Sequence, residues 1–530
     1  MYRLLAVDTG CGVQRRGFAM PLQVDQLRWM AATHGGEPAY TQLTAGATLT
    51  FADWDATSNR EARGLVASGV GPGDRVLLHL DDVHLLRWIT SYAAIHKAGA
   101  VAVPSNVRLT AHELAGIVAD AEPVAAITSA KLAPIVSEAC TTARRSLALI
   151  VADDLEQWAE LTAHESEPFQ VEVDDGDLAD IMYTSGTTGR AKGVAVRHRN
   201  THMIANGEKP WTGAAWIHCS PLSTFAGVSF VYNPMKMGMR GLYLPRFDVT
   251  AWIDAVERER PTCAFLVPAM VQLLLADERT LGADLSSLTL LSIGSAPLPP
   301  NLHQAMARLV PQAMVTNNYS MTEAGTAFTY LPPGELTRRP GSVGMPLPPT
   351  EIRIADEAGE ALPTGEVGEV LIGVGEDHRE YYGDPEATAR TWSGTWLRSG
   401  DLGRLDEDGY LYIVGRAKDV VIRGGNNISA GEVENVLYEH VGVLEAAVVA
   451  IPHDVLGEDV GAFVVARNGS DLDADELLEF CAERLADFKV PRAIWFIDEL
   501  PRNANGKVMK AGLRPPLDAT SASLGDPSAR

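Results

Sequence analysis

Short apolar segments alternate with longer stretches of helical periodicity over the first 300 residues of the chain. The pattern predicts helices at 59–67 and 83–97 and strands at 75–80 and 100–103. Two parallel strands need a long crossover between them, usually a helix, so this order of elements indicates a parallel sheet. The chain therefore favours an α/β fold with helix-covered, largely parallel sheets. Further strands are expected at 125–128, 147–151, 180–183, 263–267 and 290–293.

The alternation of predicted helices and strands ends after about residue 340. Segments 351–354 and 368–372, and the pair 403–405 and 410–414 around the turn DEDG, predict antiparallel hairpins in a small β-barrel-like part. From Arg416 onward the pattern indicates a small α+β unit. Its expected elements are strands at 420–422, 446–451 and 461–466 and helices from Gly431 and Asp473.

The predicted organisation has four parts. An irregular N-terminal extension at 1–20 precedes a large domain at 21–416 and a small, mobile C-terminal domain at 417–514. The last segment, 515–530, contains mainly small and polar residues with prolines, which is typical of disorder. With 530 residues and 46% hydrophobic content, the chain can bury a large core in more than one domain.

The charge balance argues against some partners. The chain has 44 basic and 68 acidic side chains, a formal net charge of −24, which disfavours non-specific binding to nucleic acid or anionic lipid. Its five cysteines are widely spaced and form no metal-site pattern with histidines. No run reaches the ~18 apolar residues of a spanning helix, and the apolar run at 4–7 is too short for a signal peptide. We expect a cytoplasmic protein with no nucleic-acid partner and no integral membrane association, and we leave the oligomeric state open.

The strongest chemical signal is the segment YTSGTTGRAKGV at 183–194, between two predicted strands. Its glycines and hydroxyl-bearing residues can wrap a polyphosphate with backbone N–H groups, and Lys192 supplies positive charge. The segment is not a P-loop, because no helix-opening GK[ST] follows. A solvated Ser/Thr/Gly linker is the alternative, but linkers rarely join two apolar strands and end in a single lysine. The segment therefore favours phosphate binding.

The chain resembles the adenylate-forming superfamily of acyl-CoA synthetases, luciferases and nonribosomal adenylation domains, and most closely the acyl-CoA synthetases. The resemblance spans nearly the whole chain. Six motifs appear in the order of that family: YTSGTTGRAKGV at 183–194, SIGSAPL at 292–298, NYSMTE at 318–323, SGDLG at 399–403, GRAKDVVIRGGNNIS at 415–429 and PRNANGKVMK at 501–510.

The chemistry of several motif residues suits a bound nucleotide. The ring of Tyr319 offers adenine a stacking face, and Thr322 can donate to a phosphate oxygen. Glu323 is a hard oxygen ligand for Mg²⁺. Taken alone, this segment would also fit an ordinary turn, but its place in the series of motifs favours nucleotide binding.

The resemblance extends the nucleotide site. It implies that Ser295 and Ala296 line the adenine and acyl pocket, that Thr184 lies beside the metal, that Asp401 accepts hydrogen bonds from the ribose hydroxyls, and that Arg416 lies at ribose and phosphate. The full set of predicted nucleotide residues is Thr184, Ser185, Gly186, Thr187, Thr188, Gly189, Ser295, Ala296, Asn318, Tyr319, Ser320, Thr322, Asp401 and Arg416.

Lys507 is the predicted catalytic residue for acid activation, with Glu323 and Lys192. Negative charge develops on phosphate oxygens when a carboxylate displaces pyrophosphate, and a lysine on a mobile lid can stabilise it. The resemblance also implies that Gly424 and Gly425 line the tunnel for the pantetheine arm of coenzyme A after the lid has rotated about a hinge at Lys418. An exposed lysine and a simple turn are the alternatives at these places.

The chain departs from the family pattern at four positions. Thr224 stands where many members have histidine at the carboxylate end of the acyl pocket, and Ala191, Ser320 and Ala430 replace proline, glycine and proline. The predicted substrate pocket consists of Thr224, Phe225, Val228, Lys236 and Gly294, with Phe230, Val231, Tyr232 and the methionines of 235–239 nearby. Its apolar, Met-rich composition suits an adaptable hydrophobic ligand. Lys236 either pairs with a polar substrate group or extends to solvent, and we favour the second.

The leading hypothesis is an acyl-CoA synthetase that uses ATP, Mg²⁺ and coenzyme A to activate a small carboxylic acid, whose identity stays open. A second hypothesis keeps adenylation but changes the acceptor to an amine or carrier protein, or the substrate to another oxyanion such as nitrite. A third is a non-catalytic nucleotide-binding protein. The presence of all the chemistry-bearing residues disfavours it.

Overall fold

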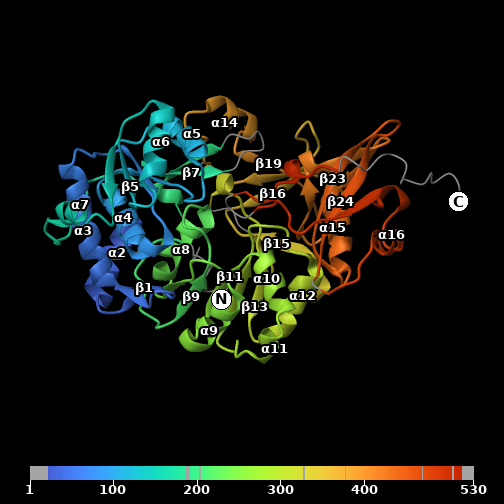
Figure 1. The fold of residues 1–530 in the computed structure, drawn as a ribbon, viewed down its shortest axis with the longest axis horizontal. Coiled ribbons are helices and arrows are strands. Elements are labelled where there is room, and N and C mark those ends of the chain that lie inside the picture. The colour runs from blue at the N-terminus through green and yellow to red at the C-terminus, as the bar shows by residue number, and fades with distance from the viewer. Residues whose placement is uncertain are drawn as a thin grey trace, which may run out of the picture.

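The computed structural model describes residues 22–184, 191–201, 204–325, 329–332, 334–375, 378–467, 469–503 and 507–515. The extension at 1–20, the loop residues Ser185, Gly186, Thr187, Thr188 and Gly189, and nearly all of the tail therefore lie outside the described residues. Four sheets organise the rest. Figure 1 shows the chain running from the blue helices on one side, through green and yellow elements in the middle, to the orange and red C-terminal elements on the other side.

The first sheet has six strands in the order β6-β5-β3-β4-β7-β8. All neighbours are parallel except β7 and β8, which form an antiparallel hairpin. The strands are β3 (Arg75–His79), β4 (Val101–Pro104), β5 (Ala125–Thr128), β6 (Ala148–Val151), β7 (Leu178–Thr184) and β8 (Lys192–Arg197), and the helices among them are α2 (Gln23–His34), α3 (Phe51–Ala67), α4 (Leu85–Lys97), α5 (Ala111–Ala121), α6 (Ala133–Ala143) and α7 (Leu155–Thr162).

The second sheet has seven strands in the order β13-β12-β11-β9-β10-β1-β2, and only the terminal pair β1 and β2 is antiparallel among these described strands. Trp252, Ile253 and Val256 pack one of its helices into the core beneath it. The strands are β1 (Pro38–Gln42), β2 (Ala47–Thr50), β9 (Ala215–His218), β10 (Arg240–Tyr243), β11 (Cys263–Leu266), β12 (Leu290–Ile293) and β13 (Met314–Asn317), and the helices are α8 (Phe225–Lys236), α9 (Val249–Glu259), α10 (Pro268–Ala276), α11 (Arg279–Gly282) and α12 (Pro300–Leu309).

The third sheet is antiparallel throughout its described strands. It contains the hairpins expected around 351–372 and 403–414. Its elements are β14 (Thr329–Tyr330), β15 (Ser342–Pro346), β16 (Glu351–Ala355), β17 (Gly368–Gly373), β18 (Trp392–Ser393), β19 (Trp396–Leu405) and β20 (Leu411–Arg416), with α13 (Glu335–Arg338) and α14 (Pro385–Thr391).

The chain passes from the third to the fourth sheet through the short 3₁₀ turn Ala417–Asp419, which contains the exposed Lys418. The fourth sheet has a core of its own, in which Val433, Leu437 and Leu477 pack two helices against the strands. Its elements are β21 (Val420–Arg423), β22 (Asn426–Ser429), β23 (Val443–His453), β24 (Gly457–Ala466) and β25 (Ala493–Phe496), with α15 (Ala430–Glu439) and α16 (Ala474–Ala482).

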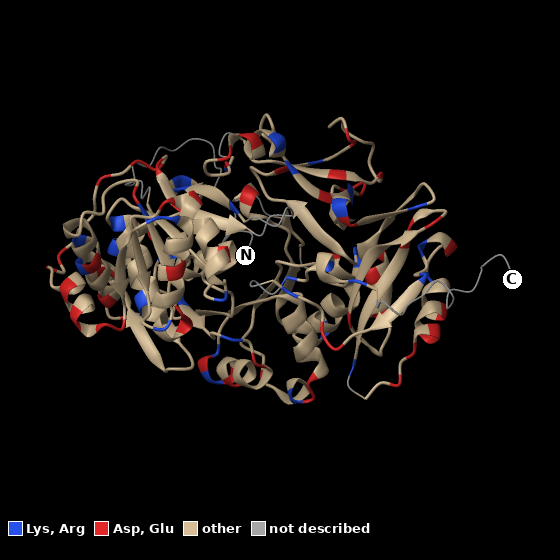
Figure 2. Cartoon of the chain, turned by 45° about the horizontal axis from the view of Figure 1, so that its top comes forward, with Lys and Arg blue, Asp and Glu red and all other residues tan. Residues whose placement is uncertain are grey.

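This architecture confirms the predicted α/β fold with largely parallel, helix-covered sheets and a separate C-terminal unit. The predicted helix at 59–67 begins earlier, at Phe51, because the Thr50 hydroxyl accepts a hydrogen bond from the backbone N–H of Asp53 and caps the helix there. Acidic and basic residues are interspersed over both halves of the molecule in the view of Figure 2.

Candidate active site

A cavity of about 2170 Å³ opens where the first three sheets meet the fourth. Thr184 and Lys192 reach it from the first sheet and Glu323 from the chain after the second. Arg416 is the last residue of β20 in the third sheet, and Lys507 comes from the C-terminal part; both line the cavity. The cavity therefore brings together residues that lie more than 300 positions apart in the sequence.

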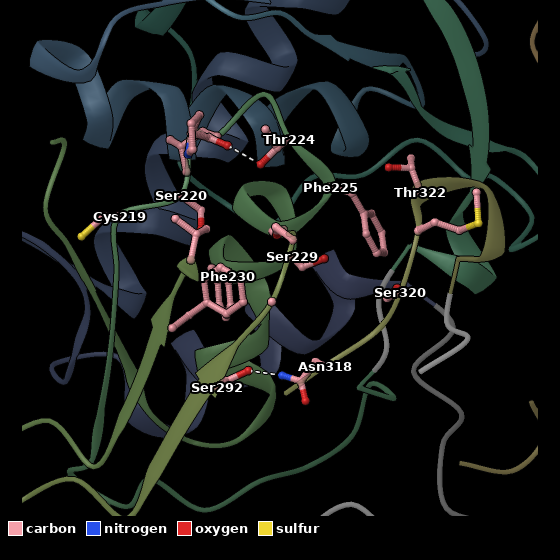
Figure 3. Close-up of a pocket in the computed structure, with 18 of the residues that line it drawn as sticks. Cys219, Ser220, Thr224, Phe225, Ser229, Phe230, Ser292, Asn318, Ser320 and Thr322 are labelled. Carbon is pink, nitrogen blue, oxygen red and sulfur yellow. Dashed lines mark hydrogen bonds between the residues drawn. The ribbon is translucent and has the colours of Figure 1, made fainter. Parts of the chain in front are cut away.

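Parallel strands explain why the motifs converge. Cys219 and Ser220 follow β9, Gly294 and Ser295 follow β12, and Asn318 follows β13; all of them line the cavity. The carboxyl ends of parallel strands meet at one edge of a sheet, where α/β proteins bind their ligands. Figure 3 shows Ser292 and Asn318 hydrogen-bonded to each other, below Ser229 and Phe230 in this view.

A metal and phosphate corner forms around Glu323. The hydroxyl of Thr184 donates to Glu323 Oε1 at 3.4 Å, and the Tyr381 hydroxyl donates to the same oxygen at 3.1 Å. The ammonium of Lys192 lies 4.8 Å from the centre of the Tyr381 ring. In the β7–β8 hairpin Thr184 and Lys192 are direct partners, so the two residues flank the loop between them.

The donor set at this corner suits Mg²⁺. One carboxylate with a neighbouring hydroxyl leaves most positions to phosphate oxygens and water, which is how Mg²⁺ usually binds beside a nucleotide. Over the described ranges, no group of three or more His, Cys, Asp or Glu side chains is arranged to hold a metal ion by itself. A metal at Glu323 and Thr184 would therefore depend on the nucleotide for the rest of its ligands.

Asp401 links two predicted nucleotide residues. The Tyr319 hydroxyl donates to Asp401 Oδ2 at 2.7 Å, and Arg416 Nε lies 3.1 Å from Asp401 Oδ1. Burial, and then the neighbouring Asp401 charge, raise the pKa of Tyr319 well above its usual value. Within the described lining, Ser399, Gly400 and Arg416 form the cavity surface here, and Tyr319 and Asp401 lie behind it.

Only part of the SIGSAPL segment lines the cavity. Gly294 and Ser295 line the cavity, whereas Ala296 is exposed and outside its described lining. A Cβ at Gly294 would come within 3.3 Å of the backbone oxygen of Asn318, so glycine permits the close approach of these two segments. Ser320 and Thr322 line the cavity as well.

Lys507 lies at the cavity beside the Asp401–Arg416 pair. Its backbone N–H donates to Asn503 Oδ1 at 2.9 Å. Lys507 is exposed at the cavity, where desolvation by the surrounding protein, and then the positive charge of Arg416, lower the pKa of Lys507 to about 8. The turn of Gly424 and Gly425, whose φ angles are +56° and +87°, lies away from the described cavity lining.

Helix α8 forms the wall of the predicted acid pocket. Its cavity face follows the spacing of a helix, with Ala226, Ser229, Phe230, Asn233 and Met237 in the lining. At the start of the helix, the Thr224 hydroxyl accepts from Gly227 N at 3.0 Å and donates to the carbonyl of Pro221 at 2.8 Å. Figure 3 shows Thr224 at this end of the pocket. Thr224 and Phe225 also line the cavity.

Two predicted pocket residues lie on the other side of α8. Val228 packs into the core of the first sheet, as do Val231 and Tyr232. Lys236 is 2% exposed, and its ammonium donates to the carbonyl of Ile204 at 3.1 Å. The prediction that Lys236 extends to solvent is wrong, because the position on the helix directs it inward; burial lowers its pKa to about 7.

Sequence reasoning missed Arg379, which is 2% exposed. Its guanidinium donates to the carbonyls of Thr322, at 2.7 Å, and Asn200, and lies 4.5 Å from the centre of the Phe225 ring. Burial lowers its pKa to about 10. Arg379 thus joins the acid-pocket wall to the segment that holds Glu323. No motif marks it, because its partners are backbone carbonyls that only the fold brings near.

The sequence also missed an aromatic wall. The Phe230 ring packs against Trp216, with centroids 5.2 Å apart, and against Phe265, with centroids 4.9 Å apart, and all three line the cavity. Met237, Met239 and Met314 lie near these rings. In the part of the chain that the structure covers, no helix combines the length and the apolarity that membrane crossing requires.

Comparisons with known proteins agree with this geometry. The family model for AMP-binding enzymes matches residues 27–382, and the model for the C-terminal domain of AMP-binding enzymes matches residues 432–507. A feruloyl-CoA synthase from an Amycolatopsis species is 37% identical over 480 residues, covering 88% of this chain and 94% of that protein. The long-chain-fatty-acid–CoA ligase FadD13 of Mycobacterium tuberculosis is 32% identical, covering 93% and 98%. The structure of the anthranilate CoA ligase AuaEII in complex with anthranoyl-AMP superposes with a TM-score of 0.83 at 26% identity, covering 92% of this chain and 95% of that chain.

Proposed function

This chain belongs to the AMP-binding enzyme family, and we propose that its cavity converts a carboxylic acid into a coenzyme A thioester in two steps. In the first step a carboxylate oxygen attacks the α-phosphorus of ATP, an acyl-adenylate forms and pyrophosphate leaves. In the second step the thiol of coenzyme A attacks the acyl carbon and AMP leaves. The protein is an AMP-forming acid–thiol ligase that uses ATP and coenzyme A as co-substrates.

One observation carries the first step: Thr184, Lys192 and Glu323 share a cavity with Lys507. Attack on the α-phosphorus needs positive charge on both sides of the nucleotide, because charge develops on the phosphate oxygens and on the departing pyrophosphate. Lys192 would face the pyrophosphate end, and Lys507 would face the attacking oxygen. These side chains come from separate parts of the chain, so one nucleotide bound between them would hold the reacting groups in place.

Mg²⁺ held by Glu323 and Thr184 would neutralise part of the triphosphate charge when it is bound. Tyr381 orients the carboxylate of Glu323 through its 3.1 Å hydrogen bond. Asp401, held by Tyr319 and Arg416 just behind the described cavity lining, would accept hydrogen bonds from the ribose hydroxyls through the remaining lone pairs of its two oxygens.

The second step requires a rearrangement. Gly424 and Gly425, the predicted lining of the pantetheine tunnel, lie away from the described cavity surface while Lys507 lies at it. We propose that rotation about Ala417–Asp419, with Lys418 as the hinge, removes Lys507 after adenylation and brings the glycine turn toward the acyl-adenylate.

The acid is proposed to be aromatic. The wall of Trp216, Phe230 and Phe265 offers a ring offset-stacked or edge-to-face packing, which stabilises aromatic pairs beyond the burial of area. A feruloyl-CoA synthase and an anthranilate CoA ligase are among the relatives, which supports the same class of substrate. The methionines around the rings leave the pocket adaptable.

Acid-dependent pyrophosphate release tests the proposal. Purified protein with ATP, Mg²⁺ and a panel of aromatic and aliphatic acids should release pyrophosphate most rapidly with aromatic acids. Lys507→Ala should abolish this release, and Lys510→Ala, a neighbouring lysine that pairs with Glu434, should retain it. Full pyrophosphate release by Lys507→Ala would overturn the role of Lys507.

The choice of acceptor needs a second measurement, because Thr224 replaces a histidine common at the carboxylate end of the pocket. Mass spectrometry with and without coenzyme A should show the thioester only when coenzyme A is present. A stable amide or carrier-protein product formed without it would favour the alternative acceptor. A cytoplasmic location stays a prediction.

A further inference from the structure

The cavity face of α8 carries two polar side chains in an otherwise apolar wall. Ser229 and Asn233 are one helical turn apart, and Phe230 and Met237 share their face of the helix. Figure 3 shows Ser229 and Phe230 projecting from α8 on the side of the cavity where Ser292 and Asn318 lie. We call Ser229 and Asn233 the α8 polar pair.

Each member of the α8 polar pair has one buried polar atom that the described protein leaves without a hydrogen-bond partner. Ser229 is 2% exposed and Asn233 is 1% exposed. Among the described residues, Ser229 Oγ and Asn233 Oδ1 have no hydrogen-bond partner, and the same holds for Trp216 Nε1 on the facing strand. Buried polar atoms without partners are rare in proteins, because each forfeits the hydrogen bond it makes with water in the unfolded chain. Three of them on side chains that line one cavity therefore point to a ligand group.

We propose that the α8 polar pair recognises a hydroxyl group on the acyl part of the substrate, so that the preferred acids are ring-hydroxylated aromatic acids. This inference rests on the proposed function. A hydroxyl group fits the pair because it donates one hydrogen bond and accepts another. Asn233 Oδ1 accepts only, whereas Ser229 Oγ can donate or accept. An ether oxygen could not serve Asn233 Oδ1, and a hydrocarbon could serve neither.

The position along the helix is consistent with such an acid. Thr224, at the start of α8, marks the carboxylate end, and Ser229 and Asn233 lie ~7.5 Å and ~13.5 Å further along the helix axis at the usual rise per residue. An aromatic ring joined to its carboxyl by a short carbon chain would place a ring substituent in this range, with the ring against Phe230.

Matched substrates test the inference. Pyrophosphate release should be measured with 4-hydroxycinnamic acid, 4-methoxycinnamic acid and cinnamic acid, and with the 3-substituted isomers. The wild-type protein should show a kcat/KM at least about tenfold higher for a hydroxylated acid than for cinnamic acid, because the unsubstituted acid leaves the pair without partners. The methoxy acid should lie between them or below.

Variants separate recognition from structure. Ser229→Ala and Asn233→Leu should each lower kcat/KM for the hydroxylated acid about tenfold and leave cinnamic acid within about twofold of wild type. The control is Ser137→Ala, an exposed helical serine whose hydroxyl bonds to the carbonyl of Ala133, and it should leave both acids unchanged. A preference for hydroxylated acids that disappears only in the pair variants supports the proposal.

Two negative outcomes are distinguishable. If wild-type protein releases pyrophosphate with aromatic acids but does not distinguish hydroxylated from unsubstituted ones, or if the variants slow both acids equally, the α8 polar pair has no recognition role and the proposed function stands. If no acid of the panel gives pyrophosphate release, the proposed function fails and the subsite fails with it.

Discussion

Replacing Lys507 with arginine should remove the alkaline limb of the pH profile for adenylation. Desolvation at the cavity and the neighbouring Arg416 lower the pKa of Lys507 to about 8, so the ammonium loses its proton in the range where the enzyme can be assayed. Only the protonated form can stabilise charge on the phosphate oxygens. For a group with a pKa of about 8, the protonated fraction falls from about 0.91 at pH 7 to about 0.09 at pH 9, so kcat/KM should fall about tenfold.

The assay is initial pyrophosphate release between pH 6.5 and 9.5 at constant ionic strength and a fixed concentration of the Mg²⁺–ATP complex. An arginine stays protonated over this range, so Lys507→Arg should be slower at pH 7 but nearly flat from pH 7 to pH 9. Lys418 lowers the pKa of Lys507 and Asp419 raises it, so Asp419→Asn should move the limb of the wild-type lysine to lower pH. An alkaline limb that persists unchanged in Lys507→Arg would refute the assignment of the limb to Lys507.

Two further predictions concern the opposite ends of the cavity. Glu323→Gln should raise the Mg²⁺ concentration for half-maximal pyrophosphate release at least about tenfold, because a neutral amide is a weaker ligand than a carboxylate. The control variant Glu407→Gln, at an exposed position, should leave this concentration unchanged. An unaltered Mg²⁺ titration in Glu323→Gln would exclude Glu323 as the ligand. Thr224→Ala should lower the thermal midpoint of unfolding, because it removes a helix cap worth about 1 kcal/mol. The rate of adenylation should stay within a few fold of wild type, because both hydrogen bonds of the hydroxyl are made within the protein. Loss of activity without loss of stability would show that Thr224 contacts the substrate.

The fold was largely predictable because its elements carry strong local patterns. The segments 75–80, 125–128 and 290–293 are short and mainly apolar, and they become β3, β5 and β12 inside the two largely parallel sheets. Helix starts were less predictable. At α3 a threonine cap at residue 50 extends the helix by two turns beyond the most periodic part of its sequence. The order of strands in each sheet depends on crossovers between distant segments, which local patterns do not specify.

The charged end of the candidate site was predictable for a related reason. Thr184 and Lys192 flank a segment rich in glycine and hydroxyl-bearing residues, whose composition already suits phosphate, whereas Glu323 and Lys507 were predicted from the order of the family motifs. The acyl end was not. On α8 the sequence alone did not indicate which face meets the cavity, so Val228 and Lys236 were assigned to the pocket, whereas Ser229 and Asn233 occupy it. A helix that is apolar on nearly all sides has no polar face to mark its orientation.

Arg379 connects the acyl end of the candidate site to its charged end. Its buried guanidinium holds the carbonyl of Thr322 next to Glu323 and supports the ring of Phe225, and within the described residues no carboxylate lies within ion-pair distance of it. A buried cation without an ionic partner is costly, and a partner of opposite charge would relieve the cost. Arg379 therefore ties the geometry of the acid wall to that of the metal corner. A substrate that displaces Phe225 would also shift the segment of Glu323, so acid selectivity should appear in the rate of adenylation as well as in acid binding.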